Sequence, residues 1–488
     1  MKLDVTSAAS LRWYGAIIGG VLVGLSFWYQ PLWWCVLPGM VLVVWALHTE
    51  KRTKRAVALA VTAGWIKTGM SVWWLIDAYP ADWLGAAPRT HQLVLILFCY
   101  VGTTVSIGAG YGIFAYLLRR GNGFKHIFFP LWTGATLLAG ELAGALFFSI
   151  YSYGPYVPLN TYFGYSMSGY SLADHTLLRY GALAGGSFAL TFILGGIAGS
   201  VVILVISPSK ARRLQGFALL IGIILLGYVP YTVPYHFQNK TVAAIGSKYP
   251  SRIYISAAEA ASGKRVLEQG VAEALAAHAS VVLLPEAAQV AGNGGSNAML
   301  QTLRRMPHDH NAVVVDSYDT VEPDGAAYAR GYIYDIDAST TYTTDKRFVV
   351  PVGEFMPYFH HSVVSALGGN AFFEGMFLRQ GDREIPSDAP PYIPSVLFCF
   401  ESDSSEIAHI KSNRSLIMHP VSHAWFHTPT TLWNQERQVL IVQSLYTRRP
   451  ILQAGNMAPS ALYIPNGSVE SGTVVGADEH HATILFSL

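Results

Sequence analysis

The sequence predicts a bundle of about seven membrane-spanning helices followed by an α/β domain. The 488-residue chain is 52% hydrophobic but only 13% charged, which is too apolar for a soluble protein of this length. Most of its Asp and Glu residues also lie after residue 240. We therefore expect a transmembrane bundle over residues 1–234 and a globular domain over residues 240–488.

Each predicted membrane helix corresponds to one apolar run, because a bilayer core needs about 20 mostly apolar residues per helix. The first run has no small-residue cleavage site after it, so we interpret it as an anchor and not as a removed signal peptide. The runs cover residues 13–29, 31–47, 56–77, 92–118, 127–150, 181–206 and 214–233.

Basic residues predict the orientation of this bundle. Clusters of Lys and Arg follow the second, fourth and sixth runs, whereas the alternate loops 78–91 and 151–180 carry only Arg89 and Arg179. By the positive-inside rule the N-terminus is cytoplasmic. Seven crossings then place everything after residue 234 on the outer face of the membrane.

The second half alternates between short β-branched or apolar runs and helical patterns, which predicts an α/β domain with helices covering a sheet. The ATILFSL segment at its end is too short to cross the membrane again. No basic stripe with interleaved aromatic residues indicates nucleic-acid binding. The expected strands are 252–256, 280–284, 312–316, 395–400 and 415–418, and the expected helices are 264–278, 298–306 and 432–446.

One strand raises a chemical question, because PSVLFCFESD carries Cys399 at its end. The other two cysteines, Cys35 and Cys99, lie in apolar runs, so Cys399 has no evident disulfide partner. A lone buried cysteine is usually an inert small hydrophobe. At a strand end, however, the thiol would project toward a substrate, and Glu401, two residues later, would project from the same side.

Two other strand ends carry reactive side chains. VVLLPEAA ends on Glu286, and TTDKRFVVPVGEFMP contains Lys346 and Glu354. A cysteine nucleophile needs a base, because a thiol of pKa about 8.5 is mostly protonated near neutral pH. Acyl chemistry also needs a cation or N–H donors at the oxyanion. On neighbouring strand ends, Glu286, Lys346 and Cys399 would supply base, oxyanion stabiliser and nucleophile.

The motifs LPE, DK followed by VPVGEFMP, and CFES resemble those of the carbon–nitrogen hydrolase (nitrilase) superfamily. Joined to amino-terminal membrane helices, they resemble the apolipoprotein N-acyltransferases in particular. FGYSMSGY at 163–170, the run at 181–192 and HAWF at 423–426 match similar family segments, and Glu141 falls in a matching membrane helix. This resemblance implies a nitrilase-like α-β-β-α sandwich for the second domain.

The resemblance implies that Glu286 is the general base, Lys346 the stabiliser of the tetrahedral intermediate and Cys399 the nucleophile that holds an acyl thioester. It makes Glu354 and Glu401 supporting carboxylates. The implied reaction moves a fatty acyl chain from phospholipid to the amino group of a diacylglyceryl-cysteine on a lipoprotein, or a related amine. The implied partners are therefore the membrane, a phospholipid and the acceptor, and no cofactor is expected. Further candidates for lipid or acceptor contact are Trp425, Phe426 and Glu141.

The sequence departs from this family in several loops. Val421, Ser422 and His423 stand where the family has Asn-Asp before Ala-Trp-Phe, and the family usually has one more membrane helix after the catalytic domain. With these departures, the chain resembles the TraB protein of conjugal transfer systems. Two alternatives to the acyltransferase therefore stay open: an amidase or nitrilase-type hydrolase, and a conjugal-transfer or secretion component whose site is vestigial or specialised.

For several residues, a structural role without a part in catalysis stays open. Lys346 could be a solvated charge at a strand end, and Glu354 could cap N–H groups in its turn. Lys67 and Glu141 both lie inside apolar runs, where charges usually face the bundle interior. They could pair across helices or line a lipid path. The histidine pairs of the second half lack the spacing of Cys or acidic ligands, so we expect loop histidines and no metal site.

Overall fold

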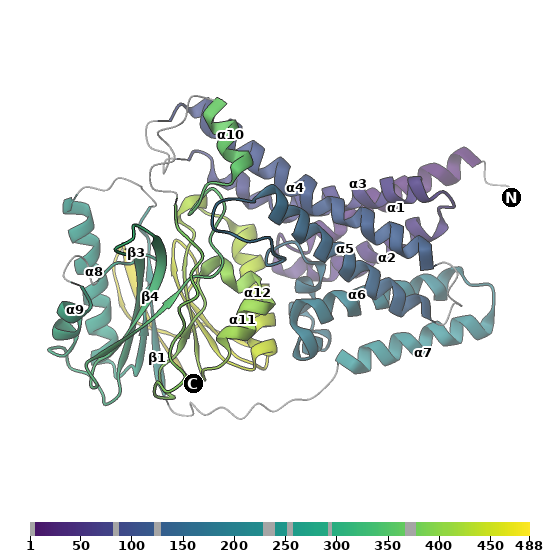
Figure 1. Cartoon of the computed structure of the whole chain (residues 1–488). Coiled ribbons are helices and arrows are strands. Elements are labelled where there is room, and N and C mark those ends of the chain that lie inside the picture. Colours follow the sequence, from purple (N-terminus) through teal and green to yellow (C-terminus); the bar gives the residue numbers. More distant parts are fainter. Residues whose placement is uncertain are drawn as a thin grey trace.

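The computed structural model describes residues 5–81, 87–121, 128–227, 240–250, 257–290, 295–366 and 377–488. It contains a helical bundle and a sheet domain, which lie side by side (Figure 1). This arrangement confirms the predicted fold class of a helical first half and an α/β second half. The predicted strand 252–256, the end of the last apolar run and the predicted domain boundary lie outside the described residues.

The bundle has seven helices among the described residues, and each coincides with one predicted run. Four segments are long and apolar enough to cross a membrane: Gln30–Thr49, Arg89–Arg120, Phe129–Tyr151 and Leu178–Ile206. The number of crossings and their orientation stay predictions. The helices are α1 (Val5–Leu25), α2 (Val36–Thr49), α3 (Thr53–Ser71), α4 (Arg89–Arg120), α5 (Phe129–Tyr151), α6 (Ala182–Ile206) and α7 (Lys210–Gly227).

Small residues allow the central helices of the bundle to approach closely. A methyl group at Gly110 of α4 would collide with the carbonyl group of Gly140 in α5, and one at Gly134 of α5 would collide with the carbonyl group of Phe192 in α6. Such contacts are typical of membrane helices, where close backbone packing replaces the hydrophobic effect as a source of helix association.

Among the described residues, the sheet domain has twelve strands in two arms. The first arm has the order β11-β12-β1-β2-β3-β4-β5, and the second has the order β6-β7-β8-β9-β10. The arms join where Ser247 at the end of β1 pairs with Asn456 at the end of β8. The strands are β1 (Thr241–Ser247), β2 (Val281–Leu283), β3 (Val313–Val321), β4 (Ala327–Asp335), β5 (Thr340–Asp345), β6 (Ser395–Val396), β7 (Ile417–Ser422), β8 (Ile451–Asn456), β9 (Ala461–Tyr463), β10 (Val469–Glu470), β11 (Thr473–Ala477) and β12 (His481–Ser487).

Four layers result from this arrangement, which confirms the predicted α-β-β-α sandwich. Helices α8 (Ala257–Ala276) and α9 (Gly295–Leu303) cover the outer face of the first arm, and α11 (Ser405–Lys411) and α12 (Thr430–Thr447) cover the second arm on the side of the bundle (Figure 1). One apolar core lies between the two arms. Its buried side chains include Val242, Leu283, Val396, Met418 and Leu452.

Helix α12 holds the sheet domain against the bundle. Arg437 donates to Asp174 at 2.6 Å, and Asn434 donates to the carbonyl oxygen of Phe27 at 2.9 Å. The short helix α10 (Tyr358–Ala366) lies near the beginning of α4 (Figure 1), where Val364 packs with Leu95. The helices predicted at 264–278, 298–306 and 432–446 correspond to α8, α9 and α12.

The predicted strand 395–400 is wrong in its second half. Strand β6 ends at Val396, and Cys399 is the first residue of a 3-10 helix, η10 (Cys399–Asp403). The chain turns here because the Glu401 side chain accepts a hydrogen bond from the N–H of Phe398 at 2.9 Å. This bond forms a tight turn where a strand would have continued.

Candidate active site

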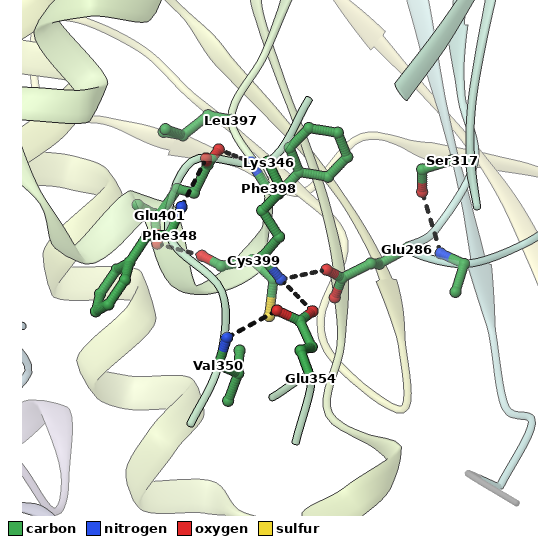
Figure 2. Close-up of polar contacts among 12 residues, drawn as sticks. Glu286, Ser317, Lys346, Phe348, Val350, Glu354, Leu397, Phe398, Cys399 and Glu401 are labelled. Atoms are coloured by element: carbon green, nitrogen blue, oxygen red, sulfur yellow. Dashed lines mark hydrogen bonds and ion pairs between the residues drawn. The ribbon is translucent and has the colours of Figure 1, made fainter. Parts of the chain in front are cut away.

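Lys346 is at the centre of the candidate site and follows β5 directly. Its Nζ atom donates to Glu286 Oε1 at 2.9 Å and to Glu354 Oε1 at 2.6 Å, so the ammonium lies between two carboxylates (Figure 2). The lysine side chain is completely buried. The alternative that Lys346 is a solvated strand-end charge is therefore wrong.

Glu286 follows β2, at the same edge of the sheet as Lys346. Its loop is fixed by the next residue, because the N–H of Ala287 donates to Ser317 Oγ in β3 at 3.0 Å (Figure 2). Neighbouring strands β2 and β3 are parallel. The sequence prediction that strand ends bring Glu286 and Lys346 together is thus correct in geometry.

Glu354 lies in a tight turn, where Val352 has a positive φ of 68°. Its Oε2 atom accepts from the N–H of Val350 at 2.7 Å while Oε1 accepts from Lys346. Glu354 therefore caps a local N–H group, as one of the two predictions has it, and also pairs with Lys346; its supporting role in catalysis stays a prediction.

Cys399 begins η10 with a φ of 26°, a left-handed conformation that costs energy for a residue with a Cβ atom and is often found at functional sites. Its side chain points toward Glu286, Lys346 and Glu354 (Figure 2). The charges of these three residues all act on its thiol.

The prediction that Glu401 projects from the same side as Cys399 is wrong, because the two residues lie in a 3-10 turn and not in a strand. The Glu401 carboxylate points away from the thiol (Figure 2) and accepts from the N–H groups of Phe398, Arg347 and Phe348. Phe398 precedes Cys399, and Arg347 follows Lys346. Glu401 thus connects the segment that carries Cys399 with the segment that carries Lys346.

Burial dominates the electrostatics of the site. It raises the pKa of the Cys399 thiol well above its usual range, and Glu286 adds to this while Lys346 opposes it. Burial alone would lower the pKa of Lys346, but Glu286 and Glu354 raise it well above its usual value. Burial also raises the pKa of Glu354 to about 7, against the lowering effect of Lys346. The resting site therefore contains a neutral thiol beside a cationic lysine.

A cavity of about 960 Å³ lies between the bundle and the sheet domain. Cys399, Glu286 and Glu354 line it from the sheet domain, and apolar side chains of α4 and α5, including Leu95 and Phe148, line it from the bundle. Trp425 and Phe426 also lie on its wall. The cavity therefore connects the reactive groups with the apolar helices.

Proteins that are similar to this chain along most of its length are named apolipoprotein N-acyltransferases. A protein named apolipoprotein N-acyltransferase from Ralstonia nicotianae is 23% identical over 93% of this chain and 84% of its own length. One from a Nostoc species is 22% identical over 96% of this chain and 91% of its own length. The chain is similar to apolipoprotein N-acyltransferases along almost its whole length. The resemblance predicted from the sequence is thus confirmed, although no family model matches the chain.

Two solved structures match the sheet domain alone. An amidase from Nesterenkonia sp. AN1, with the acetamide moiety of fluoroacetamide added covalently at its active-site cysteine, is 12% identical over 53% of this chain and 94% of its own, with a TM-score of 0.36. A carbon–nitrogen hydrolase from Helicobacter pylori is 10% identical over 51% of this chain and 89% of its own, with a TM-score of 0.35.

The segment FGYSMSGY contacts η10, which we call the nucleophile turn because the sequence predicts that Cys399 is a nucleophile. Asp403, the last residue of η10, is buried and accepts hydrogen bonds from the N–H groups of Gly164 and Tyr165, the latter at 2.7 Å. The Tyr165 ring lies 5.4 Å from the ring of Phe400. Sequence reasoning missed Asp403, although its position four residues after Cys399 was a signal that it could belong to the same turn.

Glu141 does not border the cavity. It pairs with Lys67 at 3.1 Å, and both side chains are buried. Its carboxylate also accepts from the hydroxyl of Ser168 at 2.6 Å and from that of Thr191 at 3.0 Å. The pairing across helices is confirmed, and a contact with lipid or acceptor stays a prediction for Glu141.

Several histidines of the second half contact acidic side chains. His308 and His310 both contact Asp337, at 3.4 and 2.8 Å. Among the described residues, no group of three or more His, Cys, Asp and Glu side chains could hold a metal ion. His419 and His423, which sequence reasoning missed as functional residues, lie beside the nucleophile turn and share the carboxylate of Glu436.

Proposed function

We propose that this protein is a membrane N-acyltransferase. In this proposal Cys399 takes a fatty acyl chain from a phospholipid as a thioester and passes it to the N-terminal amine of a diacylglyceryl-cysteine lipoprotein, or of a related acceptor. The observation that carries the proposal is the cavity, because one continuous space is bordered by Cys399, by two carboxylates and by apolar membrane helices. The names of the similar proteins support the acyl acceptor.

The first half-reaction forms the thioester. Because burial keeps the Cys399 thiol protonated, Glu286 takes its proton as the sulfur attacks the ester carbonyl. The cationic Lys346 stabilises the oxyanion of the tetrahedral intermediate. When the C–O bond breaks, Glu286 returns the proton to the leaving alkoxide, so that a lysophospholipid alcohol departs and the acyl chain stays on sulfur.

The second half-reaction transfers the acyl chain. The acceptor amine attacks the thioester carbonyl, the C–S bond breaks, and the thiol is restored. Apolar walls that include Trp425 and Phe426 exclude water, which would otherwise hydrolyse the thioester. In this proposal the sheet domain works on the periplasmic side of the bacterial inner membrane, where the acceptor amine is presented.

Intact-mass spectrometry of the purified chain after incubation with phospholipid tests the thioester. A mass gain of one fatty acyl group is expected for the native chain, and hydroxylamine is expected to remove it. Cys399→Ala is expected to gain no mass, and Cys399→Ser tests whether an oxygen ester can replace the thioester. The absence of any adduct, with lipid shown to be bound, would contradict the proposal.

Product analysis then separates the acyltransferase from a hydrolase. With a synthetic diacylglyceryl-cysteine peptide present, an acyltransferase yields the N-acyl peptide, whereas an amidase-type enzyme yields free fatty acid at the same rate with or without the peptide. A conjugal-transfer component with a vestigial site would form neither product.

A further inference from the structure

Strand β3 extends beyond the core of the sheet domain into the wall of the cavity. Its first three residues, Val313–Val315, pair with β2 and contribute to the core between the two arms. Beyond them the strand continues in its pairing with β4. Ser317 and Asp319 of this second part line the cavity. The end of β3 therefore presents polar residues where the core gives way to the cavity.

Alternation along β3 places the Asp319 side chain on the face of the sheet that carries the candidate site. Side chains two residues apart point to the same face. Ser317, two residues earlier, accepts a hydrogen bond from the N–H of Ala287, in the loop that carries the candidate base (Figure 2). Tyr318 points to the opposite face, where its ring stacks on that of Tyr332 with centroids 4.1 Å apart. Asp319 therefore lies on the same face as this loop.

The Asp319 carboxylate is accessible and has no partner in the described part of the chain. The residue is exposed, and no hydrogen bond or ion pair to another described residue involves it. The charges of Lys346 and Glu286 both act on it, so it lies within the electrostatic field of the candidate site. Because the cavity lies between the bundle and the sheet domain, burial raises the pKa of Asp319, although Lys346 opposes this rise. A cation that enters the cavity would stabilise such a carboxylate.

The cationic side chains near this carboxylate are already paired. Lys346 lies between two carboxylates, at 2.9 and 2.6 Å. Arg330 of β4, which lines the cavity, also pairs with two carboxylates, at 2.7 and 2.6 Å. Lys264 lines the cavity from α8 and lies 3.8 Å from Glu268, one helical turn away. Asp319 therefore adds a negative charge to the cavity wall that no contact within the described residues balances.

The proposed reaction supplies cations that fit this charge. The acceptor carries a primary amine, and because an α-amino group has a pKa of about 7.7–8.0, it arrives near neutral pH mostly as an ammonium ion. A phospholipid donor with an ethanolamine headgroup carries the same chemical group at its polar end. A carboxylate and an ammonium group form charge-assisted hydrogen bonds, which are roughly twice as strong as neutral ones.

We propose that Asp319 binds the primary ammonium group of a substrate in this cavity. It acts in binding and takes no part in the covalent steps, which remain those of Glu286, Lys346 and Cys399. The inference rests on the proposed function and deepens it, because it assigns cationic primary amines as the class of ligand that the cavity selects. The acceptor α-ammonium and the ethanolamine headgroup are the two sources of this group, and the test distinguishes them.

Equilibrium binding to a chain that cannot react tests the inference. Full-length Cys399→Ala in detergent is titrated near neutral pH with a diacylglyceryl-cysteine peptide that has a free α-amine, and with the same peptide after N-acetylation. This parent chain is expected to bind the free amine about 10–100-fold more tightly, as expected for a hydrogen bond to a charged group. Asp319→Asn in the same background should bring the ratio of the two dissociation constants close to one.

A second pair of titrations tests the lipid as the source of the ammonium group. Phosphatidylethanolamine and phosphatidylglycerol with identical acyl chains differ only in the headgroup, and only the first carries an ammonium group. A preference for phosphatidylethanolamine that Asp319→Asn abolishes would assign the lipid headgroup as the ligand. A preference confined to the free-amine peptide would assign the acceptor.

Two variants control for structural effects. Asp319→Glu keeps the charge and is expected to retain most of the preference for the ammonium ligand. Asp324→Asn makes the same chemical change as Asp319→Asn, but in the turn between β3 and β4 and outside the lining of the cavity. It should keep the preference of the parent chain.

Three results would overturn the proposal: no preference of the parent chain for either ammonium ligand, a preference that survives in Asp319→Asn, or an equal loss of all four ligands in both Asp319→Asn and Asp319→Glu. The last would make Asp319 a structural residue of β3. These titrations need no chemistry at Cys399. Failure of the proposed function would instead appear separately, as the absence of an acyl adduct on the native chain.

Discussion

Replacing Glu401 by Gln is expected to slow thioester formation while leaving the fold intact. The carboxylate is completely buried and accepts from Phe398 N at 2.9 Å, from Phe348 N at 3.3 Å and from Arg347 N. Oε2 serves the first of these N–H groups, and Oε1 serves the other two. Gln has the same shape but only one acceptor oxygen, so its amide NH₂ must face at least one N–H donor.

The magnitude follows from these contacts. Losing a hydrogen bond to a charged group costs about 1.5–3 kcal/mol. Burial raises the pKa of Glu401, so its charge is itself unfavourable, and the neutral Gln recovers part of this loss. We therefore expect Glu401→Gln to lower the unfolding free energy by about 1–2 kcal/mol. Catalysis is more sensitive, because a displacement of about 1 Å at a reacting group costs about 10²-fold in rate.

The assay is the rate of acyl-enzyme formation at saturating phospholipid, followed by intact mass. Glu406→Gln is a matched control, because Glu406 is an exposed acid on α11 five residues after Glu401. A native acylation rate in a folded Glu401→Gln chain would refute the argument that Glu401 positions the nucleophile and the lysine.

Three further predictions concern other ionisable residues of the candidate site and the bundle. Glu286→Gln is expected to reduce the acylation rate by about 10²–10⁴-fold. The same variant should speed the alkylation of Cys399 by iodoacetamide, because after burial the Glu286 charge is the largest factor that raises the thiol pKa. Slower alkylation would contradict this. Burial raises the pKa of Asp403 well above its usual range. The fold therefore loses stability as pH rises from the unfolded Asp pKa of about 3.9 through the folded pKa, because the folded state holds its proton longer. The thermal unfolding temperature of Asp403→Asn should depend less on pH than that of the native chain, whereas Asp403→Ala should unfold at a lower temperature at every pH. Lys67→Met and Glu141→Gln should each lower the unfolding free energy by about 3–5 kcal/mol, because each leaves a buried charge unpaired. In unfolding measured in detergent, the double variant should be more stable than either single variant. Losses that add in the double variant would argue against the ion pair.

Composition and strand ends predicted much of this molecule from the sequence. Seven apolar runs coincide with α1 to α7, because a long and continuous apolar stretch favours a helix that packs in a bundle. Glu286 and Lys346 were placed correctly because each directly follows a short apolar or β-branched run, and the ends of adjacent strands meet at one sheet edge. Their contact, at 2.9 Å, required no knowledge of distant loops.

The errors arose where side chains determine the backbone. Cys399 was placed in a strand because Val396, Leu397 and Phe398 are apolar, but the Glu401 carboxylate accepts from Phe398 N–H and forms a turn. Apolar alternation does not report such a local bond. The histidine cluster was missed because His419, His423 and Glu436 come from a strand end and a helix that meet only in the folded sheet domain.

The nucleophile turn is one of the places at which the bundle and the sheet domain are in contact. Glu401 connects it to the segment after β5, His419 connects Leu397 to Glu436 of α12, and Asp403 connects it to the N–H groups of Gly164 and Tyr165 in the bundle. A displacement of the 163–170 segment would therefore move Cys399 relative to Lys346. If lipid enters among the helices, as the proposed function requires, the same contacts that hold the turn also make acylation sensitive to what the helices bind. Substitutions at the Asp403 contact should therefore change the acylation rate even though Asp403 does not line the cavity.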